Sequence, residues 1–204
     1  MCKSKYYTID GSHIIETTSD NIELEILGDV LKGRRFGING SFFNSLKPTL
    51  PSSAWSIATN NGKPLGNNSM LVSYDKSIQR GTVVRFKDGE MGIYRVNSIN
   101  EFPKEHDWSI SGYSIYPFMN FGIEKMANGV NYKTAHTYLG FKGDKVYLIV
   151  KPNHMISQIL PLVEQLELEG CILLDGGGSS QLNHPDGFYN SNTKINTAVL
   201  LKEV

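Results

Sequence analysis

Short runs of alternating hydrophobic and polar residues dominate the chain and predict β-strands. The clearest is 22–26, in which three hydrophobic residues alternate with two glutamates. Two pairs of runs are separated by turn residues, Asp88-Gly89 in one and Gly143 in the other, and predict β-hairpins. The predicted strands are 6–9, 13–17, 22–26, 82–86, 91–94, 138–141 and 145–150.

One segment, 156–166, has the spacing of a helix. Its hydrophobic residues recur at intervals of three and four: Ile156, Ile159, Leu160, Val163 and Leu166. Ser157 is the expected N-cap, and Gly170 is the expected left-handed residue that ends the helix. The apolar run 171–174 follows, and it predicts a short strand buried at the centre of a sheet.

These elements predict an α+β protein: a single β-rich domain over residues 1–204, with a mixed sheet and few helices. A chain of 204 residues can bury a core without disulfides. Its two cysteines exclude a disulfide-rich scaffold and a cysteine-based zinc site. Twenty Lys and Arg balance twenty Asp and Glu, so the sequence offers no basic excess for binding nucleic acid.

The beginning of the chain lacks the apolar core of a signal peptide. No run approaches the roughly 18 apolar residues that a membrane-spanning helix needs. We therefore expect a cytoplasmic protein that does not bind membranes. The sequence leaves the oligomeric state open.

The most informative segment is 175–181, Asp-Gly-Gly-Gly-Ser-Ser-Gln, directly after the apolar run. A carboxylate at the end of a buried strand is held on a rigid element. Three glycines leave backbone N–H groups open to a ligand, and such groups bind phosphate. The segment lacks the Lys-Ser/Thr of a P-loop, and no helical pattern follows it as in dinucleotide-binding folds. The alternative is a tight turn that Asp175 merely caps.

A second unusual segment is 36–44, in which Asn39-Gly40 precedes two phenylalanines. An amide beside aromatic rings suits a carbohydrate, because the amide can bind sugar hydroxyls and the rings can pack on the sugar. A hairpin turn at Asn39-Gly40 is the alternative.

Taken together, these segments resemble the phosphodiester glycosidase family. Residues 38–43, Ile-Asn-Gly-Ser-Phe-Phe, are similar to its Asn-Gly-Gly-Phe-Phe motif, with Ser41 in the second glycine position. Residues 174–180 match its Leu-Asp-Gly-Gly-Gly-Ser-Ser/Thr motif throughout. His136-Thr137 stands where the family has Arg-Thr, and Lys194 where it has a basic residue before the last strand. The resemblance covers most of the chain.

The resemblance implies a phosphodiester glycosidase-like domain that hydrolyses the C1–O bond of a sugar-1-phosphodiester, or of a related phosphorylated sugar or nucleotide. We expect no cofactor and assign no metal ligand, and dependence on a divalent metal stays open. The expected catalytic residues are Asp175, which orients water or stabilises a cationic carbon, and His136, an acid or base. The expected ligand-binding residues are Asn39, Gly40, Phe43, Thr137, Gly176, Gly177, Gly178, Ser179, Ser180 and Lys194.

Two departures from the family pattern support a second hypothesis. His136 and Lys194 both stand where arginine is expected, and neither offers the bidentate phosphate contact of a guanidinium. The alternative function is a non-catalytic module that sequesters a small phosphorylated nucleotide or sugar. On simpler interpretations, His136 is a hydrogen-bonded structural residue and Lys194 is a solvated surface charge.

Overall fold

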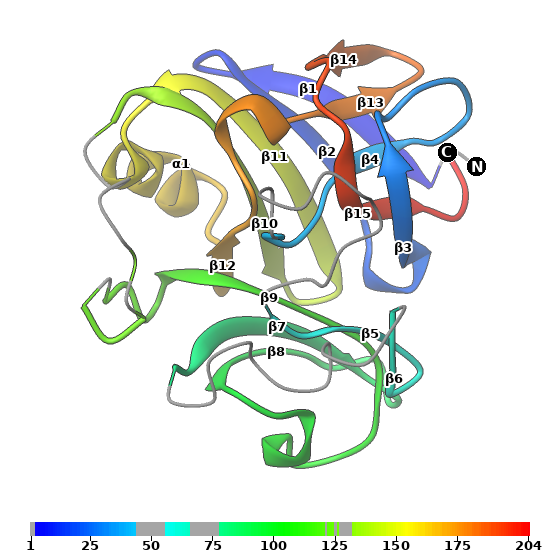
Figure 1. The fold of residues 1–204 in the computed structure, drawn as a ribbon, viewed down its shortest axis with the longest axis vertical. Helices are drawn as coiled ribbons and strands as arrows, with labels where there is room; N and C mark the ends of the chain where they lie inside the picture. Colours follow the sequence, from blue (N-terminus) through cyan, green and yellow to red (C-terminus); the bar gives the residue numbers. More distant parts are fainter. Residues whose placement is uncertain (1–2, 44–55, 66–77, 121, 125, 127–131) are drawn as a thin grey trace.

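The computed structural model describes residues 3–43, 56–65, 78–120, 122–124, 126 and 132–204. Within these ranges the protein forms fifteen β-strands, four short 3-10 helices and one α-helix. Two antiparallel sheets pack together, and α1 lies beside β10, β11 and β12 of the larger sheet (Figure 1). The prediction of a β-rich protein with few helices is confirmed.

The larger sheet contains ten strands. Its main path runs through β1 (Ser4–Ile9), β2 (Ser12–Thr18), β11 (Lys145–His154), β10 (Thr134–Lys142), β12 (Gly170–Leu173), β9 (His106–Tyr116), β5 (Ala58–Asn60) and β6 (Lys63–Pro64). From β9 the sheet also continues to β7 (Arg80–Phe86) and then β8 (Met91–Val96). The predicted hairpins are confirmed as the pairs β7–β8 and β10–β11.

The smaller sheet contains five strands. Their order is β14 (Gly187–Tyr189), β13 (Leu182–His184), β4 (Gly37–Asn39), β15 (Ile195–Leu201) and β3 (Ile22–Asp29). This sheet brings together the beginning and the end of the chain, because β3 and β15 pair along their lengths.

The prediction of a mixed sheet is wrong, because every strand pair within the described residues is antiparallel. A strand–helix–strand segment, such as the one from β11 to β12, often joins parallel neighbours. Here β10 lies between the two strands and is antiparallel to both. β11 and β12 therefore run in the same direction without pairing.

The predicted helix is present but divided. A 3-10 helix, η3 (Ile156–Ile159), precedes α1 (Leu160–Gln165), and Met155 rather than Ser157 occupies the N-cap position. Pro161 has no N–H to donate, and it lies at the start of α1, where none is needed. Glu167, with φ 53°, takes the left-handed conformation expected of Gly170, which instead begins β12.

The central strands of the larger sheet are buried on both faces. One face of β10 and β11 packs on the smaller sheet through residues such as Leu139 and Leu148. The opposite face packs on η3 and α1 through Tyr138 and Ile149. Double burial explains why these strands are almost continuously apolar in sequence rather than alternating.

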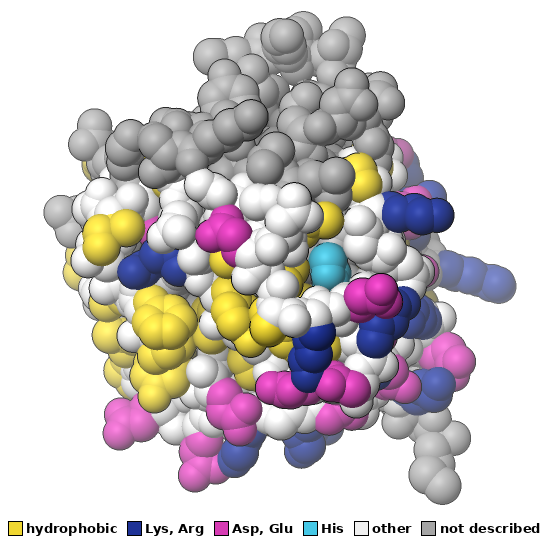
Figure 2. Space-filling model, turned by 90° about the horizontal axis from the view of Figure 1, so that it is seen from below, with side chains coloured by type: hydrophobic (Ala, Val, Ile, Leu, Met, Phe, Trp, Pro, Cys, Tyr) yellow, Lys and Arg dark blue, Asp and Glu magenta, His cyan; other side chains and the backbone are white. Residues whose placement is uncertain are grey.

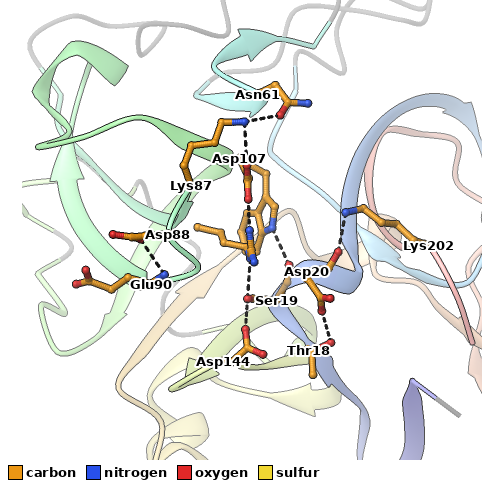
Figure 3. Close-up of polar contacts among 12 residues, drawn as sticks. Thr18, Ser19, Asp20, Asn61, Lys87, Asp88, Glu90, Asp107, Asp144 and Lys202 are labelled. Atoms are coloured by element: carbon orange, nitrogen blue, oxygen red, sulfur yellow. Dashed lines mark hydrogen bonds and ion pairs between the residues drawn. The ribbon is translucent and has the colours of Figure 1, made fainter. Parts of the chain in front are cut away.

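A polar network joins β7 and β9 to the turn between β10 and β11 (Figure 3). Arg85 of β7 pairs with Asp107 of β9, and its Nε donates to Ser19 Oγ over 2.9 Å. The Ser19 hydroxyl in turn donates to Asp144, in the turn between β10 and β11. Trp108 Nε1 donates to the Ser19 carbonyl over 3.0 Å. The network therefore fixes three separate segments around one buried serine.

Replacing Arg85 with alanine is expected to lower the free energy of unfolding by about 2 kcal/mol, because Asp107 and Ser19 lose a charged partner at a partly buried site. Urea unfolding of both proteins measures the difference. Lys5→Ala is the matched control, since the Lys5–Glu16 pair involves an exposed ammonium. Equal losses in the two variants would contradict a structural role for the network.

No described helix is long and apolar enough to span a membrane. On the face shown in Figure 2, acidic and basic side chains are interspersed around a group of hydrophobic ones. Five large hydrophobic residues in the described part from the end of β9 to the start of β10 are exposed: Tyr116, Phe118, Met119, Ile123 and Tyr132.

Candidate functional site

Asp175 lies directly beyond the end of β12, where both sheets hold its backbone. Its N–H donates to the Gly40 carbonyl over 3.1 Å, and its carbonyl accepts from Asn39 Nδ2 over 2.7 Å. The preceding residue, Leu174, donates its N–H to the Thr137 carbonyl over 2.9 Å. The carboxylate thus projects from a backbone fixed by β4 and β10, as expected for a residue that ends a buried strand.

Asn39 and Thr137 form hydrogen bonds with other residues of the protein near Asp175. Asn39 is completely buried, and its Oδ1 accepts from Thr137 Oγ1 over 2.8 Å and from the Gln181 N–H over 2.9 Å. This differs from the expected role of Asn39 in binding sugar hydroxyls. The observed role is to join β4, β10 and the glycine-rich segment.

The hairpin alternative at Asn39-Gly40 is wrong. Gly40 donates its N–H to the Thr197 carbonyl over 2.8 Å, so the chain continues alongside β15. A Cβ on Gly40 would lie 2.6 Å from Thr197 Oγ1. Glycine is therefore required for this close approach.

The last two glycines and Ser179 form a 3-10 turn, η4 (Gly177–Ser179), and Gly176 is its N-cap. Gly176 donates its N–H to Asp175 Oδ1 over 3.0 Å, and the turn itself uses the N–H groups of Ser179 and Ser180. Gly177 has φ 61°, a conformation that favours glycine. Among the described residues, the N–H groups of Gly177 and Gly178 have no hydrogen-bond acceptor. They are the two N–H groups of the turn that can face an anion.

Burial raises the pKa of Asp175 to about 6, while hydrogen bonds from the Ser179 side chain and the Gly176 N–H act in the opposite direction. A carboxyl group with this pKa changes its charge close to neutral pH. Perturbed carboxyl groups in cavities are typical of catalytic sites, although structural networks also produce them.

Asp175 and His136 line a common cavity of about 380 Å³. Its polar part is formed by Thr134, His136, Asp175, Gly176 and Gly177. Its apolar and aromatic part is formed by Phe42, Tyr113, Met126, Tyr132, Ile156, Leu173 and Leu174. The rings of Phe42 and Tyr113 are in edge contact, with centroids 5.2 Å apart. Such a cavity can contact a ring-shaped ligand both through aromatic side chains and through polar groups.

His136 is only 6% exposed. Burial lowers its pKa, and the backbone carbonyls of Tyr132 and His154 act in the opposite direction. A Cβ on Gly176 would come within 3.3 Å of His136 Nδ1, so the first glycine of the motif provides space for this ring. At neutral pH the imidazole is therefore uncharged and suited to accept a proton.

Several expected ligand-binding residues lie outside the cavity lining. Phe42 lines it instead of Phe43. Ser180 is completely buried and Gly178 is exposed beside Ser191, to which its carbonyl is hydrogen-bonded. Lys194 is exposed near Asp29, whose pKa is lowered mainly by the hydrogen bond from Lys32 and also by the charge of Lys194.

Arg80 is a cation near the cavity that the sequence did not indicate. Its guanidinium carbon lies 4.3 Å from the ring centroid of Tyr113, and its Nη1 donates to the Glu124 carbonyl over 2.6 Å. Both β7 and β9 are needed for this arrangement. The alternation in β9, Trp108-Ser109-Ile110-Ser111 and then Tyr113-Ser114-Ile115, is a signal for a strand that is absent from our predictions. The stacking of Arg80 on Tyr113 depends on the pairing of β7 with β9, which sequence spacing does not reveal.

No group of three His, Cys, Asp or Glu side chains in the described part of the chain could hold a metal ion.

Comparison with solved structures relates this architecture to a known enzyme. The catalytic domain of zebrafish N-acetylglucosamine-1-phosphodiester alpha-N-acetylglucosaminidase, auto-inhibited by its pro-peptide, superimposes with a TM-score of 0.67 at 16% identity. The match covers 98% of this chain and 82% of the zebrafish chain. This chain has the fold of that glycosidase domain.

A hypothetical protein from Synechocystis shares the fold more distantly, with a TM-score of 0.56 and 9% identity over 97% of this chain. This chain covers 61% of the Synechocystis one. In sequence, no family model and no curated protein matches. The likeness to the glycosidase domain is therefore one of fold, and the case for a shared activity depends on the cavity.

Proposed function

We propose that this protein hydrolyses the glycosidic C1–O bond of a sugar-1-phosphodiester or of a related phosphorylated sugar or nucleotide. The observation that carries the proposal is that Asp175 and His136 line one cavity together with the aromatic rings of Phe42, Tyr113 and Tyr132. The glycosidase fold of the zebrafish catalytic domain supports it.

In this reaction the leaving group is a phosphate monoester, which is already a stable anion. The site must therefore stabilise negative charge at the phosphate and positive charge at C1 more than it must donate a proton. The N–H group of Gly177, which lines the cavity and has no acceptor among the described residues, is the proposed phosphate contact. Arg80, stacked on Tyr113, adds a positive charge near the cavity.

Asp175 and His136 would have different roles in the reaction. Ionised Asp175 stabilises the cationic carbon, and neutral His136 accepts the proton of the attacking water. The water oxygen bonds to C1, the C1–O bond breaks, and the phosphate monoester leaves with the electron pair. Asn39 and Thr137 would hold Asp175 in place, which changes their role from the one expected from the sequence.

A non-catalytic binding module is the second candidate. The described cavity lining contains no cationic side chain, and His136 takes the place of an expected arginine. To separate the two candidates, the protein is incubated with a panel of sugar-1-phosphodiesters and denatured, and the released compounds are identified by mass spectrometry. Free sugar and phosphate monoester support hydrolysis, whereas stoichiometric recovery of intact diester supports sequestration.

The rate of hydrolysis is expected to fall as Asp175 becomes protonated. Since burial raises the pKa of Asp175 to about 6, kcat/KM should decline below that pH with an acid limb centred near it. Initial rates between about pH 4 and pH 8 measure the profile. A rate that stays constant down to about pH 4.5 would show that ionised Asp175 is not required.

A further inference from the structure

A second buried histidine lies against His136. His154 of β11 is 3% exposed, and its ring meets that of His136 edge to face, with centroids 4.9 Å apart and an interplanar angle of 89°. The register of the β10–β11 hairpin produces this contact, because a bulge separates Thr134, which pairs with His154, from His136. The sequence separation of the two histidines gave no indication of it.

His154 is itself held by Tyr138. The Tyr138 hydroxyl and His154 Nε2 are 2.8 Å apart, and Tyr138 is completely buried. His136 Nε2 is buried without a hydrogen bond to any described residue. His154 Nδ1 likewise has no well-aligned acceptor, although the backbone carbonyls of Lys151 and Pro152 are close enough to raise the pKa of His154. A buried ring nitrogen without a partner is uncommon in structures, and His136 Nε2 calls for an explanation.

We propose that His154 is a positioning residue for His136, fixing the orientation of its ring in the cavity and preventing the two imidazoles from being charged together. In this arrangement Tyr138 orients His154, and His154 orients His136. Only the predicted effect of His154 on turnover rests on the proposed function. The contact between the rings and its effect on protonation do not depend on any substrate.

The charges around the pair support this role. His154 faces His136 and Tyr138 of β10 and lies near Lys151 of its own strand, while Asp175 lines the cavity beside His136. Burial, the charge of His136 and that of Lys151 lower the pKa of His154 to about 4. Protonation of His136 therefore makes protonation of His154 harder, and the two groups must titrate as a coupled pair.

Two substitutions separate the ring contact from the titration. His154→Phe keeps an aromatic ring against His136 but removes the titrating nitrogens. His154→Gln keeps a hydrogen-bonding group for Tyr138 but removes the ring. Histidine side-chain NMR signals are followed against pH in the wild type and both variants, and kcat and KM are measured with a sugar-1-phosphodiester.

In the wild type, the His136 signal should show two titration steps, and in both variants a single step. His154→Gln should lower kcat about tenfold with less than a threefold change in KM, while His154→Phe should retain kcat within about threefold. His106→Gln is the matched control, because His106 is a buried, hydrogen-bonded histidine outside the cavity lining. It should leave the His136 titration unchanged.

A single-step titration of His136 in the wild type would overturn the inference, as would an unchanged kcat in His154→Gln. If the wild-type protein cleaves no sugar-1-phosphodiester, the proposed function fails, but the NMR titration still decides whether His154 and His136 are coupled. If one variant does not fold, the other still provides the comparison with the wild type.

Discussion

Replacing Asp175 with asparagine is expected to reduce kcat/KM for sugar-1-phosphodiester hydrolysis by about a thousandfold. The neutral amide occupies the same volume but cannot stabilise a developing positive charge at C1. Because the backbone hydrogen bonds of Asp175 to Gly40 and Asn39 do not involve its side chain, the fold should be preserved. Steady-state kinetics with the purified variant measure the loss.

The same substitution should stabilise the protein at neutral pH. The folded state raises the pKa of Asp175 from 3.8 to about 6, so it binds the proton more tightly than the unfolded state does. Wild-type stability at this site therefore decreases as pH rises from about 4 to 6, and the deficit persists above that range. Asp175→Asn should be more stable by on the order of 2 kcal/mol at pH 7.5, with the difference disappearing near pH 4.

The control for both effects is Asp186→Asn. The Asp186 carboxylate is 73% exposed in the turn between β13 and β14. Its replacement should leave activity unchanged and alter stability by less than about 0.5 kcal/mol. Full activity in a folded Asp175→Asn variant would remove the carboxylate from the mechanism.

Replacing Asn39 with alanine is expected to lower the free energy of unfolding by about 3 kcal/mol, the largest stability effect that the site predicts. The change leaves the Thr137 hydroxyl, the Gln181 N–H and the Asp175 carbonyl without their partner in a completely buried position. Chemical denaturation of the variant and the wild type measures the loss. Turnover should fall as well, because the end of β12 is no longer fixed to β4.

Asn183→Ala provides the comparison in the neighbouring strand. Asn183 lies in β13, which pairs with β4, and its Nδ2 donates to the Arg35 carbonyl over 2.9 Å at a partly exposed position. We expect a loss of less than about 1 kcal/mol for this variant. A similar loss in the two variants would mean that Asn39 does not have the central structural role assigned to it.

Local sequence patterns predicted the regular hairpins and the helical segment because those elements are determined by nearby residues. Strand β9 was missed although its hydrophobic residues alternate with serines, because Gly112 shifts the alternation by one residue in the middle of the strand. The serines are buried as well, so the alternation does not mark one buried and one exposed face. Its hydroxyls are paired with those of neighbouring strands, as in the contacts of Thr59 with Ser109 at 2.7 Å and of Thr82 with Ser111 at 2.6 Å. Which buried hydroxyls pair between neighbouring strands depends on the register of the two strands, and the sequence of one strand does not determine that register.

The candidate site was predictable to the extent that it lies in contiguous motifs. Asp175 and the glycines follow a recognisable buried strand, and His136 was found through its position relative to Thr137. The roles of Asn39 and Lys194 were not predictable. The role of Asn39 depends on contacts among three segments, and the position of Lys194 depends on the pairing that brings the start of β15 near Asp29. A single domain over 1–204 and a cytoplasmic location stay predictions.

The most direct test of the central claim follows the oxygen atom of water during turnover. The protein is incubated in ¹⁸O-labelled water with a sugar 1-(methyl phosphate) diester, and both products are analysed by mass spectrometry, with early time points to limit exchange at the sugar hemiacetal. Cleavage of the C1–O bond predicts ¹⁸O in the free sugar and none in methyl phosphate. Label in methyl phosphate would show P–O cleavage, and recovery of unaltered diester would show no hydrolysis; either result would contradict the account.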